Sequence, residues 1–227
     1  MNIEVIQVRS GVKRNAITLT CLGFVGIILS LVLFLSSSAL FGPGLCIFTL
    51  GIISTVLGIS KQMEPEVSVT LSAEGLSYHH RRGSLLIEWG NIQRFDSPKS
   101  RDGLETIELP FIGIRLKKVN PVLDMIPGRL ATGLLTEQRP LLMSAVTLDE
   151  SLEALEDYLN SEFTPLLING DRYRGVLAMF GHRCEMLNRN LGYHLYIPFD
   201  CLDREPKEFL RLLRNYLKEV KKLDLTD

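Results

Sequence analysis

The sequence contains no aspartate, glutamate, lysine, arginine or histidine from Asn15 to Ser60, a run of 46 residues. The absence of charge excludes an ordinary solvated surface for this run. One helix needs about 20 apolar residues to cross the core of a bilayer, so the run is too long for a single crossing. Inside lipid the backbone must satisfy its own hydrogen bonds, so we predict two transmembrane α-helices joined by a short turn.

We expect the first helix over residues 16–35 and the second over residues 39–59, with the turn at Ser36–Ser38. Pro43 suits the first turn of a helix, where a missing N–H costs little. A turn that extends through Gly44 is the alternative, so the start of the second helix stays open.

A cleaved signal peptide is a competing interpretation of the first apolar run. Arg9, Lys13 and Arg14 would form its charged region, and Ser37–Ala39 resembles a cleavage site. The apolar region of a signal peptide has about 7–15 residues, whereas this run is longer and a second one follows it. We therefore favour a transmembrane hairpin.

The expected turn between the two helices also lacks charge, whereas both flanks of the hairpin are basic. Arg9, Lys13 and Arg14 precede the first helix, and Lys61 follows the second. Basic residues are enriched in cytoplasmic loops. We therefore expect a multi-pass membrane protein with both termini in the cytoplasm.

Motifs of metal sites and of common enzymes are missing. No CxxC or HxxxH spacing organises His182, Cys184, His194 and Cys201, so we expect no metal site, no cofactor and no disulfide in a reducing compartment. P-loops, dinucleotide fingerprints and nucleophile elbows are also absent, so we expect no enzyme. Residues 61–227 hold 22 basic and 25 acidic residues, a balance that argues against a nucleic-acid partner.

Residues 61–227 are expected to form one soluble α+β domain after the anchor region, residues 1–60. Short alternating segments from Val67 to Lys117 predict strands. Residues 118–192 show mainly helical spacing and are expected to be an insert. A last amphipathic helix is predicted by a stripe at Leu210, Leu213, Leu217 and Val220.

Four short motifs carry a family resemblance: Ala73–Leu76, Ile87–Ile92, Tyr196–Pro198 and Glu208–Leu210. They resemble those of uncharacterised bacterial inner-membrane proteins with a two-helix anchor and a pleckstrin-homology-like (PH-like) domain. The resemblance implies a PH-like β-barrel with a C-terminal capping helix, located in the bacterial inner (cytoplasmic) membrane. It brings no catalytic residues, and a fold alone does not assign a function.

The most basic cluster of the soluble part lies in one expected strand turn. His79, His80, Arg81 and Arg82 are our candidates for contact with anionic lipid headgroups. A basic residue near such a surface gains roughly 1 kcal/mol. The alternative is a solvated hairpin turn. Neighbouring histidines on a strand point to opposite faces, which argues against their binding one metal ion.

Small residues are spaced four apart in each expected transmembrane helix. Gly26 and Ser30 form one pair, and Ser54 and Gly58 form the other. Small residues at this spacing let helices approach closely. We expect packing within one hairpin, with dimerisation as the alternative.

We therefore predict a membrane-anchored binding or scaffold module at the cytoplasmic face of the membrane. Its partners would be the lipid bilayer and a membrane or cytoplasmic protein. Two alternatives remain: a weak sensor of anionic lipid, and an enzyme whose helical insert builds a pocket from His182, His194 or Glu137.

Overall fold

The computed structural model describes residues 4–11, 15–36, 40–102, 105–146 and 164–224. The chain divides into two compact units. Residues 10–66 form one unit, and residues 1–9 join residues 67–227 in the other. The N-terminal residues therefore group with the strands that follow the hairpin rather than with the hairpin itself.

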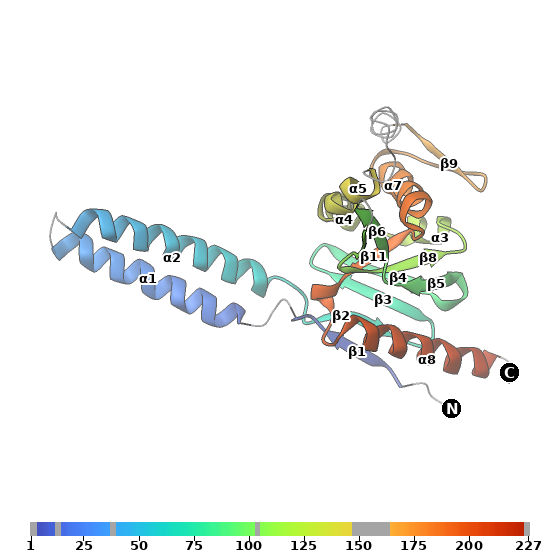
Figure 1. Ribbon diagram of the computed structural model, residues 1–227, viewed down its shortest axis with the longest axis horizontal. Helices are drawn as coiled ribbons and strands as arrows, with labels where there is room; N and C mark the ends of the chain where they lie inside the picture. The colour runs from blue at the N-terminus through green and yellow to red at the C-terminus, as the bar shows by residue number, and fades with distance from the viewer. Residues whose placement is uncertain (1–3, 12–14, 37–39, 103–104, 147–163, 225–227) are drawn as a thin grey trace. The chain divides into compact units, whose positions relative to one another are not determined.

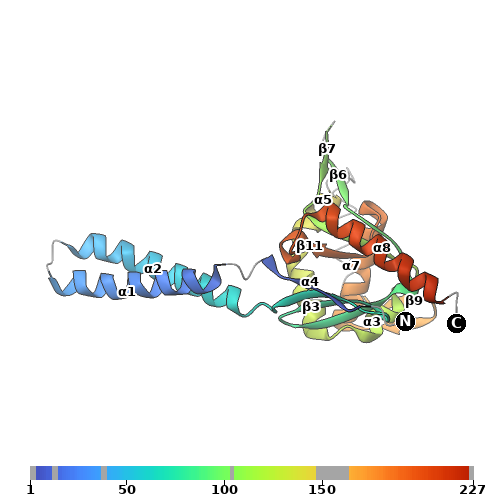
Figure 2. The same cartoon turned by 90° about the horizontal axis from the view of Figure 1, so that it is seen from below.

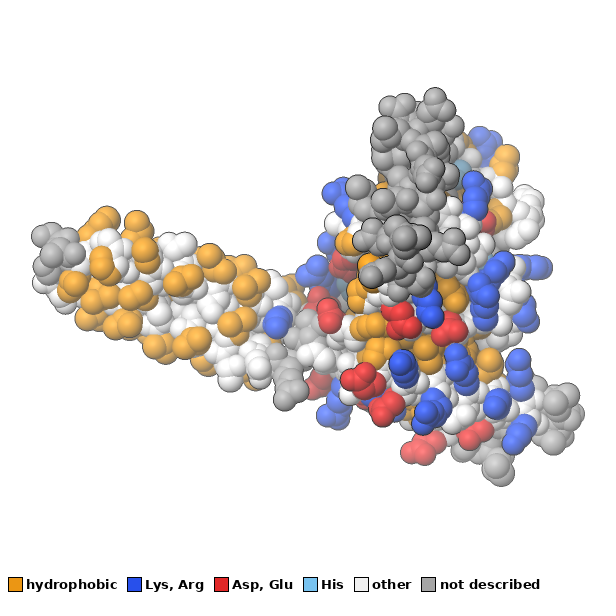
Figure 3. Space-filling view, in the orientation of Figure 1, with side chains coloured by type: hydrophobic (Ala, Val, Ile, Leu, Met, Phe, Trp, Pro, Cys, Tyr) orange, Lys and Arg blue, Asp and Glu red, His pale blue; other side chains and the backbone are white. Residues whose placement is uncertain are grey.

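The first unit is a pair of antiparallel helices, α1 (Ala16–Ser36) and α2 (Phe41–Gln62) (Figure 1). By length and composition both could cross a membrane, with mean hydropathies of 2.6 and 1.9. Their outer surface is covered with hydrophobic side chains (Figure 3). α2 extends to Gln62, whose Nε2 donates a hydrogen bond to Thr20 Oγ1 (2.8 Å). Ser37 and Ser38 of the expected turn lie outside the described residues.

The second unit begins with a four-stranded antiparallel sheet in the order β1-β2-β3-β4. Its strands are β1 (Ile6–Arg9), β2 (Val67–Leu71), β3 (Gly75–His80) and β4 (Gly83–Glu88). β1 was not expected, because four residues before a charged stretch give no periodic signal. Val8 lies opposite Val69, so the two strands that flank the hairpin in sequence are neighbours in this sheet.

A second antiparallel sheet has the order β11-β8-β5, with a separate two-stranded pair beside it. The bounds are β5 (Ile92–Asp96), β8 (Phe111–Leu116), β11 (Leu195–Pro198), and, for the pair, β6 (Lys99–Asp102) and β7 (Glu105–Glu108). Figure 2 shows the β6–β7 hairpin projecting from the rest of the unit. The described strands form no closed barrel, so the observed fold is a mixed α+β arrangement of two open sheets.

The insert between β8 and β11 contains helices and one unexpected strand pair. Its elements in the described part are α3 (Asn120–Met125), α4 (Gly128–Glu137), α5 (Arg139–Val146), β9 (Leu166–Ile168), β10 (Asp171–Tyr173) and α7 (Gly175–Leu191). Asn169 and Gly170 join β9 to β10. Their φ angles are positive, 51° and 92°, as in the tight hairpin turns in which Asn-Gly is the preferred pair. Residues 147–163 of the insert lie outside the described residues.

The last helix, α8 (Pro206–Asp224), closes a core shared by both sheets. Phe209, Leu213 and Tyr216 on its inner side are buried. The Tyr216 hydroxyl donates to the carbonyl oxygen of Leu71 (3.2 Å). The Trp89 ring lies 5.5 Å from the Tyr216 ring, so α8 is fixed against the first sheet by aromatic packing as well as by apolar burial. This unit also has short 3₁₀ turns at Trp89–Asn91 and Phe199–Cys201.

Candidate functional site

Small residues at intervals of seven lie along the α1–α2 interface. Seven residues are close to two helical turns, so each set forms a line along one side of its helix. The buried members are Ala16, Gly23 and Ser30 in α1, and Gly44, Gly51 and Gly58 in α2.

At three of these positions the two backbones are in direct contact. A Cβ atom added to Gly51 would lie 2.9 Å from the Gly23 carbonyl oxygen, and one added to Gly23 would lie 2.7 Å from the Gly51 carbonyl oxygen. A Cβ atom on Gly58 would lie 2.7 Å from the Thr20 nitrogen. Such close approach maximises van der Waals contact, which is a main force for helix association in lipid.

Two of the four predicted packing residues, Ser30 and Gly58, belong to these buried lines. Ser30 and Gly58 are buried, whereas Gly26 and Ser54 are partly buried. The hydroxyl of Ser30 donates to the Ile27 carbonyl oxygen of its own helix (2.7 Å). Sequence reasoning missed Gly23, Gly44 and Gly51, because it looked for a spacing of four. The spacing of seven was the available signal.

The β3–β4 turn lies at the end of the first sheet where the chain leaves for the hairpin. Val69 stands opposite Tyr78, so continuation of the register by two residues brings His80 level with Val67. Arg9, the last residue of β1, also pairs with Val67. The basic turn and both strand ends that lead to the hairpin therefore share one edge of the unit.

His80 connects this turn to the helical insert. Its Nδ1 accepts the backbone N–H of Arg82 (3.2 Å), so the ring proton is on Nε2, which donates to Glu137 Oε1 at the end of α4 (3.2 Å). The Arg81 guanidinium lies 3.6 Å from the same carboxylate oxygen. The His80 hydrogen bond, together with the nearby arginines, lowers the pKa of Glu137, although partial burial opposes the shift.

The other two lipid-contact candidates are also held by neighbours. The Arg82 side chain crosses α4 at Gly133, where an added Cβ atom would lie 2.8 Å from Arg82 Cδ. His79 Nε2 lies 3.0 Å from Thr70 Oγ1 on β2. Arg81 and Arg82 remain exposed, but the turn rests on the insert. Sequence reasoning did not find the contact of His80 with Glu137, because the two residues are 57 positions apart.

The residues considered for an enzyme pocket are not brought together. Glu137 is bound to His80, and His182 Nε2 lies 3.2 Å from the Thr164 carbonyl oxygen. His194 is buried before β11, where its Nδ1 accepts the Leu116 N–H (3.0 Å). Within the described ranges no group of three or more acidic, histidine or cysteine side chains could hold a metal ion. Cys184 is buried in α7, and burial raises the pKa of its thiol.

His194 should make folding stability depend on pH. Burial, with a smaller effect of Arg115, lowers its pKa from 6.5 to about 4. Between these values the unfolded chain binds a proton that the folded chain does not, so the free energy of unfolding falls as the pH drops from 6.5 to 4. Because the ring keeps some solvent contact, we expect a loss of about 2 kcal/mol.

The measurement is denaturant unfolding of the detergent-solubilised chain from pH 7 to pH 4, followed by fluorescence of Trp89, the one tryptophan. His194→Gln keeps a side-chain acceptor and cannot titrate, so its stability should decline less over this range. An identical pH dependence for both chains would show that His194 does not cause the decline.

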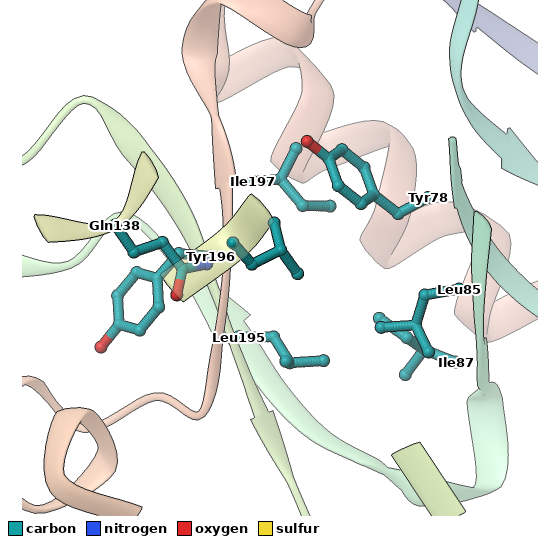
Figure 4. A pocket seen from close by; sticks show the side chains of 8 residues that line it. Tyr78, Leu85, Ile87, Gln138, Leu195, Tyr196 and Ile197 are labelled. Atoms are coloured by element: carbon teal, nitrogen blue, oxygen red, sulfur yellow. The ribbon is translucent and has the colours of Figure 1, made fainter. Parts of the chain in front are cut away.

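A small cavity lies between the two sheets (Figure 4). Its volume is about 10 Å³, which is close to the minimum for one water molecule. Apolar side chains from both sheets and from α4 dominate its wall: Tyr78, Leu85, Ile87, Leu134, Gln138, Leu195, Tyr196 and Ile197. The cavity is therefore a packing gap in the core rather than a substrate site.

Comparison with known protein families gives a match. A family model described as "Protein of unknown function (DUF2982)" matches residues 69–219. The matched range begins in β2 and ends in α8, so it excludes β1 and the hairpin. No curated protein and no solved structure matches the chain.

Proposed function

For this chain, which belongs to the DUF2982 family of proteins of unknown function, we propose the role of a binding or scaffold module tethered to a membrane by the α1–α2 hairpin. The pairing of β1 with β2 is the observation that carries this proposal. Two strands that share hydrogen bonds lie on the same side of a bilayer. Both ends of the hairpin therefore return to one compartment, as a two-span anchor requires.

The compartment in this proposal is the cytoplasm of a bacterium, and the membrane is its inner membrane. Arg9, Lys13 and Arg14 before α1 and Lys61 at the end of α2 support this orientation through the preference of basic residues for the cytoplasmic side. Cys184 and Cys201 would then lie in a reducing compartment, where thiols stay reduced.

The arrangement of the soluble unit supports binding over catalysis. The PH-like fold stays part of this proposal: a four-stranded sheet, a three-stranded sheet and a C-terminal helix support it, whereas the described strands form no closed barrel. The scattered positions of Glu137, His182 and His194 favour a partner surface over an active site.

The edge that carries the β3–β4 turn is the proposed binding region. Only residues 63–66 separate α2 from β2, a link of at most about 14 Å when extended. In this proposal the short link keeps this edge close to the headgroups. Arg81 and Arg82 make weak sensing of anionic lipid the second candidate function, although their contacts with α4 reduce the charge that they offer to lipid.

Photocrosslinking in living cells tests both candidates with one pair of variants. A photoreactive amino acid replaces Ser84, which is exposed beside the turn, or Glu74, which is exposed at the opposite end of the same sheet. We expect the Ser84 variant to capture a discrete protein, visible as a gel shift, and the Glu74 variant to capture none. Phospholipid adducts at Ser84 alone would favour the lipid sensor, and equal or no capture at the two sites would contradict the proposal.

A further inference from the structure

The outer side of α8 carries a row of positive charge, which we name the α8 basic ridge: Lys207, Arg211, Arg214, Lys218 and Lys221. Steps of three and four residues align these side chains on one side of the helix. All five are exposed, and the row extends for about 21 Å. Figure 3 shows lysine and arginine side chains gathered along this helix.

The fold itself makes little use of the α8 basic ridge. The opposite side of the helix supplies the core contacts through Phe209, Leu213 and Tyr216. Arg214 lies 3.6 Å from Asp96, but both side chains are 55% exposed, so water and salt screen this pair. The ridge is a concentrated positive surface on a chain whose net charge is only −1.

One segment of the same sequence has the complementary charge. Residues 147–163 contain no basic residue and six acidic ones: Asp149, Glu150, Glu153, Glu156, Asp157 and Glu162. The segment starts after α5 and ends before β9. Figure 1 shows α5 and β9 on one side of the two sheets and α8 on the other. Within one chain, the α8 basic ridge is therefore far from the two elements that flank the acidic segment.

We propose that the α8 basic ridge binds the acidic segment 147–163 of a second copy of this chain. Each copy offers one ridge and one segment, so the contact is head-to-tail and can link more than two copies. Anchoring confines the copies to one membrane plane and raises their effective concentration, which lets weak surface contacts act. Because the contact is electrostatic and exposed, it should weaken as salt rises.

The test is a charge exchange between two full-length variants. The ridge variant carries Lys207→Glu, Arg211→Glu and Lys218→Glu, and the segment variant carries Glu153→Lys, Glu156→Lys and Asp157→Lys. Differently labelled copies are reconstituted in one bilayer, and their association is measured by energy transfer. We expect wild-type copies to associate at low salt, and each variant alone to associate about tenfold more weakly.

Mixing the two variants should restore association, because acidic and basic surfaces then meet again. A control with Lys117→Glu, Lys118→Glu and Arg172→Glu has the same charge change at exposed positions elsewhere and should associate like the wild type. Milder Lys→Gln and Arg→Gln changes in the ridge replace the first variant if it fails to fold, as judged by Trp89 fluorescence.

Three results would overturn the proposal. The first is an absence of wild-type association at low salt, and the second is a mixture that associates no better than the separate variants. The third is a ridge variant that associates normally but loses binding to added vesicles of anionic lipid. That outcome would assign the ridge to a lipid surface instead.

Discussion

A chain in which residues 11–65 are replaced by an Asn-Gly turn will fold as a soluble protein, whereas a chain that starts at residue 61 will not remain stably folded. The Ser10 nitrogen donates to the Glu66 carbonyl oxygen (3.1 Å), so the two ends of the hairpin region are already adjacent. β1 and β2 are antiparallel, and a two-residue turn joins such strands without strain.

The shorter chain loses β1, which contributes to the core as well as to the sheet. Val8 is fully buried, and its carbonyl oxygen accepts the Ser68 hydroxyl (3.1 Å). Tyr216 also donates to the Glu4 carbonyl oxygen (3.1 Å). Loss of one buried valine costs about 2 kcal/mol, and an exposed β2 edge with lost hydrogen bonds adds several more. That sum is a large share of the 5–15 kcal/mol typical of a folded domain.

Size-exclusion chromatography and thermal unfolding monitored by Trp89 fluorescence will compare the two chains. The hairpin-deleted chain should be monomeric at low concentration, with a single unfolding transition. Val8→Asp in the hairpin-deleted chain is the matched control, because it keeps the chain length while placing an unpaired charge in the core. Equal stability of the two chains would mean that β1 is dispensable.

The sequence predicted the elements whose signals are local. The uncharged run from Asn15 to Ser60 indicated two helices, and the structure has two helices long and apolar enough to span a membrane. The stripe predicted for the last helix agrees with the burial of Leu210, Leu213 and Val220 in α8. Both signals depend on residues within one element, so no knowledge of the tertiary fold was needed.

The features that the sequence did not predict depend on distant partners. β1 becomes a strand because Val8 meets Val69 across the whole hairpin, and its four residues alone have no pattern. The contact between His80 and Glu137 likewise depends on where α4 packs. The β9–β10 pair, in contrast, has a local signal, because Asn169-Gly170 is a recognisable hairpin turn. The prediction missed it because the helical periodicity of the surrounding residues was given more weight.

Gly51→Leu will separate the α1 and α2 helices. No side chain fits at Gly51, since even a Cβ atom would lie 2.9 Å from the Gly23 carbonyl oxygen and 3.0 Å from the Ile27 nitrogen. Both neighbours are backbone atoms, which cannot move unless the whole of α1 shifts. Overpacking costs about 1–3 kcal/mol, and the lost contacts along the seven-residue lines add to it, so we expect a total near 4 kcal/mol.

Gly42→Leu is the control for this substitution. Gly42 belongs to the same helix, yet a Cβ atom added there would meet nothing within 4 Å. Both variants replace a glycine of α2 with leucine, so they change the composition identically and differ in the space available to the new side chain. The distance between spin labels on the outer faces of α1 and α2 should increase in Gly51→Leu alone, with a lower unfolding temperature in detergent. If both variants keep the wild-type distance, the close contact of Gly23 with Gly51 does not hold the hairpin together, and the hydrogen bond from Gln62 to Thr20 is the next contact to test.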